Sequence, residues 1–223
     1  IDTFRFEERQ LLEYAATLIV DGHHSKALAV VSERGHSFWL DHPGFMNRLA
    51  QWEACRFMAE LGCLVDEVRS GVKKMSGTAS KWVEAYAAKD GWYRVDHAQR
   101  SLEAWVVKME DEPEAGLEKA LGLVRRNHET LLEEMAKGFT QALLDSSWST
   151  AGVLQQSAIY PDLVEGRGGR VAYFFVDAMR FEMAVDLVEL LQVGEEVRLQ
   201  PAVGVLPSIT AMGMAALLPG ASS

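Results

Sequence analysis

Apolar residues recur at three- and four-residue intervals from Thr3 to about Trp148, the spacing that places side chains on one face of an α-helix. Alanine, leucine, glutamate and lysine, which favour helices, are abundant in this stretch. The pattern predicts an all-α region with breaks at glycine- and proline-containing turns. The expected helices cover residues 7–21, 43–61, 80–87, 98–110 and 117–145.

The pattern changes after Glu165, where Gly166 to Gly169 forms a flexible breaker. A short apolar run rich in Val, Tyr and Phe then predicts a strand, and a second β-like run follows after a helical stretch. The predicted order is strand 170–176, helix 178–191, strand 196–205 and helix 211–218. This alternation is typical of the opening of a parallel α/β sheet. We therefore expect a helical region over residues 1–165 and an α/β domain that begins at residue 166.

The composition is that of an ordinary globular protein, with 223 residues of which 48% are hydrophobic and 24% are charged. The apolar runs are far shorter than the roughly 18 residues that cross a bilayer, and no signal-peptide pattern opens the chain. We therefore expect a soluble cytoplasmic protein. Because the chain begins at Ile1 and ends directly after an apolar stretch, we interpret it as a segment of a longer protein.

Charge and cysteine usage narrow the chemistry further. The net charge of −10 repels phosphate backbones, so a phosphate site here would depend on metal ions and not on a basic surface. Cys55 and Cys63 lie on one predicted helix with a rise of about 12 Å between them, which is too far for a disulfide. We interpret both as reduced core residues.

Two oxygen-bearing residues follow the predicted strands. Asp177 comes directly after the first strand, and Thr210 comes after the second, at the start of the last helix. Ligands of parallel sheets bind at the carboxyl ends of the strands. A carboxylate there can hold a metal ion, a coordinated hydroxyl can become a nucleophile, and a second metal about 3.5–4 Å away can stabilise the leaving oxygen. The pair predicts the beginning of a two-metal phosphoryl-transfer site.

Simpler roles are open for the same residues. Asp177 could be the N-cap of helix 178–191, and Ser208 or Thr210 could cap the last helix. Arg180 and Glu182 could be ordinary first-turn helix residues. The histidines all fall in the helical region without ligand spacing, and we interpret them as surface or packing residues. They are His23, His24, His36, His42, His97 and His128.

Two stretches carry a family resemblance. Residues Val176 to Met183 read VDAMRFEM, and residues Leu206 to Gly220 read LPSITAMGMAALLPG. Together they resemble the PglZ family of the alkaline phosphatase superfamily. In that superfamily the first strand ends in a metal-binding Asp, and the nucleophile lies ten residues before a glycine of a small-residue helix. Thr210 and Gly220 have this spacing, so the resemblance implies Thr210 as nucleophile and metal ligand in preference to Ser208.

The resemblance implies further properties. Asp177 is the implied metal ligand, Arg180 and Ser208 are candidate phosphate contacts, and the cofactors are two divalent ions, with zinc expected. A threonine nucleophile points to phosphate esters and away from sulfate esters. The parent protein would be a metal-dependent phosphodiesterase, nuclease or phosphatase of a bacterial BREX phage-defence system. Its partners would be other BREX components, including a DNA methyltransferase, with DNA reached through the assembly.

The superfamily completes its site with Asp and His ligands that would follow residue 223, so we expect this segment alone to be inactive. The implied fold is a helical region followed by the start of an alkaline-phosphatase-like domain with a largely parallel sheet. A non-catalytic scaffold, whose helical region binds partner proteins, is the alternative function. A phosphomutase-like relative would differ only in its substrate.

Overall fold

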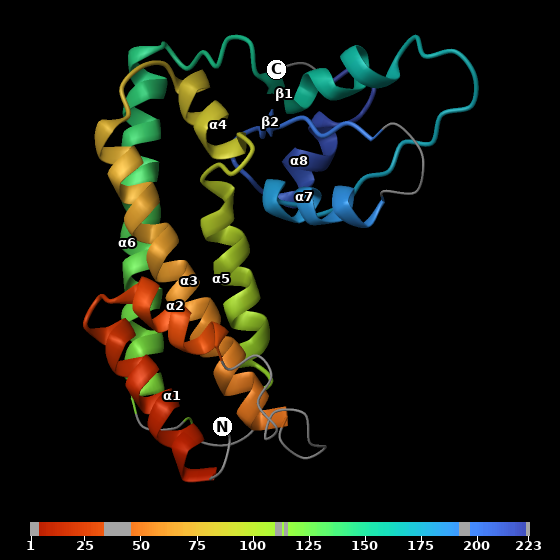
Figure 1. Cartoon of the computed structure of the whole chain (residues 1–223). Helices are drawn as coiled ribbons and strands as arrows, with labels where there is room; N and C mark the ends of the chain where they lie inside the picture. The colour runs from red at the N-terminus through yellow and green to blue at the C-terminus, as the bar shows by residue number, and fades with distance from the viewer. Residues whose placement is uncertain (1–4, 34–45, 110–112, 114–115, 192–196, 222–223) are drawn as a thin grey trace. The chain divides into compact units, whose positions relative to one another are not determined.

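The computed structural model describes residues 5–33, 46–109, 113, 116–191 and 197–221 (Figure 1). The chain divides into two compact units. Unit 1 comprises residues 1–76 and 94–141, and unit 2 comprises residues 77–93 and 142–223. The C-terminal part of the chain is therefore packed together with a short stretch of the predicted helical region.

Unit 1 is helical, as the apolar periodicity predicts. It contains α1 (Arg5–Val20), α2 (His24–Ser32), α3 (Met46–Lys74) and most of α5 (Tyr93–Val106) and α6 (Leu117–Asp145). The bounds of α6 coincide with the prediction, whereas α2 was not predicted. The predicted turn at residues 41–44 lies outside the described residues. Among the described helices, none combines the length and apolarity that a membrane span requires.

Helix α3 continues well past its predicted end at Leu61. Val65 and Val68 on the added turns are each 1% exposed, and α3 contacts both α1 and α2. This burial offsets the cost of about 1 kcal/mol for Gly71 inside a helix. At the other end of α3, the Trp52 indole Nε1 donates a hydrogen bond of 3.0 Å to Glu8 of α1. Tertiary packing therefore sets the length of this helix.

A close approach of α2 to α3 depends on one glycine. A Cβ atom added at Gly62 would lie 2.4 Å from Cδ2 of His24, so any side chain there would collide with the imidazole ring. The ring is buried, and its Nδ1 lies 3.0 Å from Oδ2 of Asp66 on α3. His24 is therefore a packing residue, as the sequence analysis expects.

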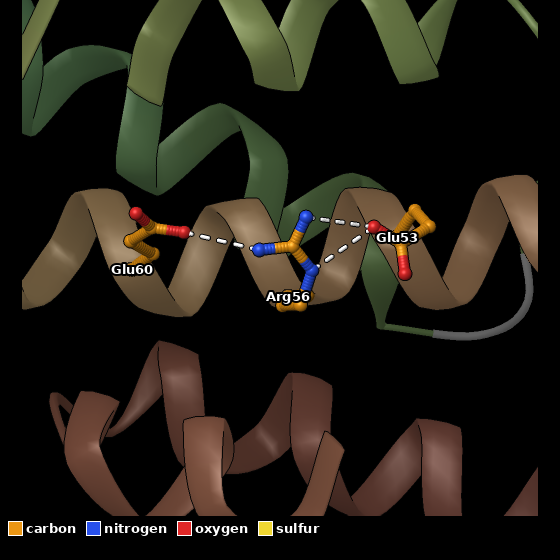
Figure 2. Close-up of polar contacts among 3 residues, drawn as sticks. All are labelled: Glu53, Arg56 and Glu60. Atoms are coloured by element: carbon orange, nitrogen blue, oxygen red, sulfur yellow. Dashed lines mark hydrogen bonds and ion pairs between the residues drawn. The ribbon is translucent and has the colours of Figure 1, made fainter. Parts of the chain in front are cut away.

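Charged side chains connect α3, α5 and α6 in unit 1. Arg94 lies 2.7 Å from Glu67, and Arg69 lies 3.2 Å from Glu134. The surface of α3 also carries a local network, in which Arg56 bonds Glu53 at 2.8 Å and Glu60 at 3.2 Å (Figure 2). These residues are three and four positions apart, so their side chains meet on one helix face. Each such partly exposed pair adds a few tenths of a kcal/mol.

Unit 2 combines a helix of the first half of the chain with short C-terminal elements. They are α4 (Ala79–Ala87), β1 (Leu154–Gln155), a 3₁₀ turn at Gln156–Ala158, a π-helical turn at Tyr160–Val164, α7 (Phe181–Leu190), β2 (Ala202–Val203) and α8 (Thr210–Ala216). β1 pairs with β2 in parallel, with Leu154 opposite Ala202 and Gln155 opposite Val203. The predicted fold class, a helical region followed by the beginning of a parallel sheet, is confirmed.

The strand predicted at residues 170–176 does not form. Residues 171–176 have no regular secondary structure, and β2 occupies only two residues of the predicted strand 196–205. An apolar run rich in Val, Tyr and Phe shows that a segment suits a sheet, but a strand exists only where a neighbouring strand supplies the hydrogen bonds. In unit 2 that pairing joins β1, which was not predicted, to β2.

Candidate functional site

Asp177 lies in a turn between the apolar segment 171–176 and α7, and its side chain is exposed. The next residue, Ala178, has φ +54°, a left-handed conformation that costs a non-glycine residue about 1–3 kcal/mol. Arg180, not Asp177, occupies the N-cap position of α7, and no side-chain hydrogen bond caps this helix. The capping alternative for Asp177 is therefore wrong.

Two neighbours of Asp177 form an ion pair of unequal exposure. Nη2 of Arg180 lies 3.0 Å from Oε1 of Glu182, and the Arg180 side chain is 56% exposed while that of Glu182 is fully buried. A buried carboxylate requires a partner, because its desolvation costs several kcal/mol. Glu182 is thus not an ordinary surface residue of the first turn, and it restrains the exposed guanidinium of Arg180 beside the Asp177 turn.

Phe181 anchors the same segment to the helical part of unit 2. Its ring centroid lies 6.3 Å from that of Tyr86 and 5.5 Å from that of Tyr93, in tilted and edge-on contacts. Such aromatic pairs contribute about 0.5–1.5 kcal/mol beyond their buried area. The stretch 77–93 therefore packs against the first residue of α7, which directly follows Arg180.

Thr210 is the first residue of α8, and its side chain is exposed. The N-cap position belongs to Ile209, and no side-chain hydrogen bond caps the helix, so the capping alternative for Thr210 and Ser208 is also wrong. Ser208 is exposed as well and follows the cis peptide bond between Leu206 and Pro207. The Thr210 hydroxyl therefore faces solvent at the helix entrance.

Gln156, directly after β1, holds the segment that carries Thr210. Its side-chain Nε2 donates a hydrogen bond of 3.0 Å to the carbonyl oxygen of Gly213, and its Oε1 accepts one of 3.0 Å from the backbone N–H of Val205. Sequence reasoning missed this residue, because the contacts join positions about fifty residues apart and no local pattern signals them. Only the pairing of β1 with β2 brings Gln156 to this place.

The apolar segment 171–176 is held by aromatic contacts and not by strand pairing. Tyr173 lies 6.1 Å from Tyr160 and 4.4 Å from Phe175, measured between ring centroids. Desolvation by these surroundings raises the pKa of the Tyr173 phenol above its usual value. Its neighbours remain open to solvent, with Phe174 82% exposed. The segment that leads into Asp177 thus presents apolar side chains at the surface.

Two of the described residues carry oxygen donors that suit a divalent metal ion. Asp177 and Thr210 offer exposed oxygen atoms of the kind that divalent ions bind, yet zinc takes four ligands. Within the described parts of the chain, no group of three or more His, Cys, Asp or Glu side chains is arranged to hold a metal ion. The oxygen donors of Asp177 and Thr210 fit a divalent ion in chemistry, but the described residues alone do not make up a four-ligand site.

The described histidines belong to unit 1 and not to the unit of Asp177. They are His23, His24, His97 and His128, whereas His36 and His42 lie outside the described residues. His128 is buried, and its Nε2 lies 3.7 Å from Asp96. The interpretation of this histidine as a packing residue agrees with its surroundings.

A comparison with known families finds a match in the C-terminal segment. Residues 154–223 match the family described as the BREX system PglZ alkaline phosphatase-like domain. The match confirms the resemblance to the PglZ family. It begins at β1 and includes Gln156, and so starts before the two stretches at residues 176–183 and 206–220 that carry the resemblance. No curated protein and no solved structure matches the chain significantly.

Proposed function

We propose, from the PglZ domain match over residues 154–223, that the protein containing this chain hydrolyses phosphoesters as a metal-dependent phosphodiesterase, nuclease or phosphatase. The observation that carries the proposal is the accessibility of Thr210. Its hydroxyl is exposed at the entrance of α8, it does not cap that helix, and it lies within the matched segment. A nucleophile must be accessible in this way.

In the proposed reaction, the Thr210 Oγ forms a bond to phosphorus while the bond from phosphorus to the leaving oxygen breaks. The hydroxyl proton passes through solvent to the leaving alcohol, and a phosphothreonine remains. Water then attacks the same phosphorus, releases the phosphate product and restores the hydroxyl. The two divalent ions implied by the family, with zinc expected, would supply Lewis acidity at this place and would be held in part by Asp177 and Thr210.

Arg180 has the charge to bind a phosphate oxygen. Its guanidinium is 56% exposed and restrained by Glu182, so a phosphate close to Asp177 could accept hydrogen bonds from it. Ser208 is a second candidate phosphate contact, because its hydroxyl is exposed two residues before Thr210. Loss of either contact would raise KM more than it lowers kcat.

The test compares variants of the full-length protein in hydrolysis of an activated phosphodiester with added Zn²⁺, Mn²⁺ or Mg²⁺. We expect Thr210→Ala and Asp177→Asn to abolish metal-stimulated hydrolysis, while Thr210→Ser retains part of it because a hydroxyl remains. Ser149→Ala is the control, since it removes an exposed hydroxyl that lies outside the matched segment. Wild-type rates in Thr210→Ala would refute the assignment. Mass spectrometry of a quenched reaction should place the phosphoryl group on Thr210.

A non-catalytic scaffold is the second candidate function. It is favoured by the exposed apolar side chains that concentrate between residues 171 and 218, such as Phe174 at 82% and Leu190 at 79% exposed. Surfaces of this kind are typical of protein contacts. If Thr210→Ala and Asp177→Asn preserve phage defence in cells while Phe174→Ser abolishes it, the scaffold function is the correct one.

We further propose that the protein acts in the bacterial cytoplasm with other BREX components, including a DNA methyltransferase, and reaches DNA through that assembly. The support is the description of the matched domain as part of the BREX system. Co-purification of the tagged full-length protein with the methyltransferase from cells that carry the whole system tests this partner. Absence of the methyltransferase from the purified complex would contradict it.

A further inference from the structure

The amide of Gln156 bonds backbone groups on both sides of the segment that holds Ser208 and Thr210. Its acceptor takes the N–H of Val205 before that segment, and its donor reaches the carbonyl oxygen of Gly213 after it, each at 3.0 Å. The two anchored positions lie on either side of Thr210 in the chain. One side chain therefore restrains both ends of the segment that contains the exposed hydroxyl.

This double contact requires a side chain with a donor and an acceptor in one planar group, which a primary amide provides. The backbone around it leaves room for the amide. A Cβ atom at Gly204 would lie 3.6 Å from Oε1, and one at Gly213 would lie 3.5 Å from Nε2, both ordinary contact distances. Gln156 itself begins the 3₁₀ turn directly after β1, whose pairing with β2 ends at Val203. The side-chain hydrogen bonds of Gln156 thus connect the two segments just beyond the last backbone pair of β1 and β2.

We propose that Gln156 is a positioning residue for the nucleophile segment, holding the Thr210 hydroxyl in its reactive place through the backbone at Val205 and Gly213. It touches neither substrate nor reacting atoms. The inference rests on the proposed function of Thr210 as nucleophile. Its physical basis is that a displacement of about 1 Å at a reacting group can lower the rate on the order of 100-fold.

The neighbouring residue Gln155 provides a matched control. It carries the same amide and lies in β1, but its Nε2 donates to Thr150 Oγ1 and to the carbonyl oxygen of Val153, away from the nucleophile segment. Substitution of Gln155 tests the general effect of losing a side-chain amide in this region. Substitution of Gln156 tests the specific contacts with the Thr210 segment.

The experiment uses the full-length protein, the activated phosphodiester and the variants Gln156→Met and Gln155→Met. We expect Gln156→Met to lower kcat on the order of 10- to 100-fold with KM changed less than about twofold, because the hydroxyl is misplaced while the substrate contacts remain. Gln155→Met should stay within about threefold of wild type. Amide hydrogen exchange over residues 205–213 should be faster in Gln156→Met and unchanged in Gln155→Met.

A second variant covers the case in which Gln156→Met does not fold. Gln156→Glu keeps the acceptor for Val205 but, when ionised, loses the donor for Gly213. Protonation restores that donor, so its rate relative to wild type should rise as the pH is lowered toward the carboxyl range near about 4. Circular dichroism of Gln156→Glu over the same pH range separates positioning from folding. A positioning role predicts an unchanged fold while the rate changes, and unfolding that parallels the loss of rate would overturn the inference.

The outcomes separate the two proposals. If Thr210→Ala is inactive but the Gln156 variants retain wild-type kcat, the positioning role is refuted and the proposed function stands. If the wild-type protein hydrolyses no phosphoester, the proposed function fails, and the inference as a positioning role for catalysis fails with it. Unchanged hydrogen exchange over 205–213 in Gln156→Met would overturn the inference even where Thr210 proves to be the nucleophile.

Discussion

The guanidinium of Arg180 lies 3.0 Å from a carboxylate, that of Glu182, which is completely removed from solvent. The two residues are separated by Phe181, whose ring packs against Tyr86 and Tyr93. The ion pair with Arg180 therefore balances part of the charge of Glu182 a few residues after the Asp177 turn. The same ion pair therefore contributes to the stability of α7 and restrains Arg180, the candidate phosphate contact.

Arg180→Ala should destabilise the protein by about 1–3 kcal/mol, because it removes a charge partner from a buried carboxylate. The exposure of Arg180 places the loss below that of a fully buried pair. Adding Glu182→Gln should recover part of the loss, since the buried charge that Arg180 helps to balance is then removed. Urea unfolding of the two variants and their parent measures the effect. Lys137→Ala, which breaks an exposed pair with Glu133, is the control and should change stability by less than about 0.5 kcal/mol.

Ala178→Gly should stabilise the folded protein or leave it unchanged, although glycine usually destabilises. The left-handed φ of +54° at Ala178 strains an alanine and not a glycine, which offsets the greater entropy of glycine in the unfolded chain. Ala184→Gly, inside α7, is the control and should cost about 0.5–1 kcal/mol. Thermal unfolding of both variants measures the difference. A loss at position 178 as large as that at 184 would contradict the strained conformation.

The Glu103–Arg125 ion pair should stabilise unit 1 at neutral pH, and this contribution should be lost in acid. Arg125 Nε lies 2.8 Å from Oε1 of Glu103, and this hydrogen bond, with its charge, holds the pKa of the Glu103 carboxyl below the ordinary 4.5. Because the folded-state pKa is depressed, the contribution to stability is present above the ordinary pKa and is lost as the pH falls through the folded-state value.

Glu103→Gln should therefore lower the free energy of unfolding at about pH 7 and make it less dependent on pH below about 5, since the group that titrates is gone. The loss should be at most about 1 kcal/mol, because both side chains are more than a third exposed. Urea titrations across this pH range measure it. A parallel loss at every pH would show that Glu103 acts through packing and not through its charge.

Cys55 and Cys63 should differ in reactivity toward a thiol reagent at about pH 8. Burial raises the pKa of the Cys55 thiol to about 12, so in the folded protein it stays protonated and shielded. Cys63 is partly exposed and should react first. In urea both should react at similar rates. Mass spectrometry of peptides after brief labelling distinguishes them, and rapid labelling of Cys55 in the folded protein would contradict its burial.

Local periodicity was enough to predict much of the helical structure. The apolar spacing over residues 117–145 gives the bounds of α6, and the small-residue stretch after Pro207 gives a helix that begins at Thr210, one residue before the predicted start. These features depend on contacts between residues three and four positions apart, which the order of residues records directly. The motif around Asp177 and Thr210 likewise carried the resemblance to the PglZ family, and residues 154–223 match that domain.

Contacts between distant positions decided the remainder. The sequence by itself determined which residues carry oxygen donors and where helices are favoured, but not that Gln156 would bond Val205 and Gly213. The sequence also predicted a strand at 170–176. In the structure that segment has no regular secondary structure, and the parallel pair is formed by β1 and β2. A helix forms its hydrogen bonds within its own segment, whereas a strand or a side-chain clamp needs a distant partner. Only the folded chain brings those partners together.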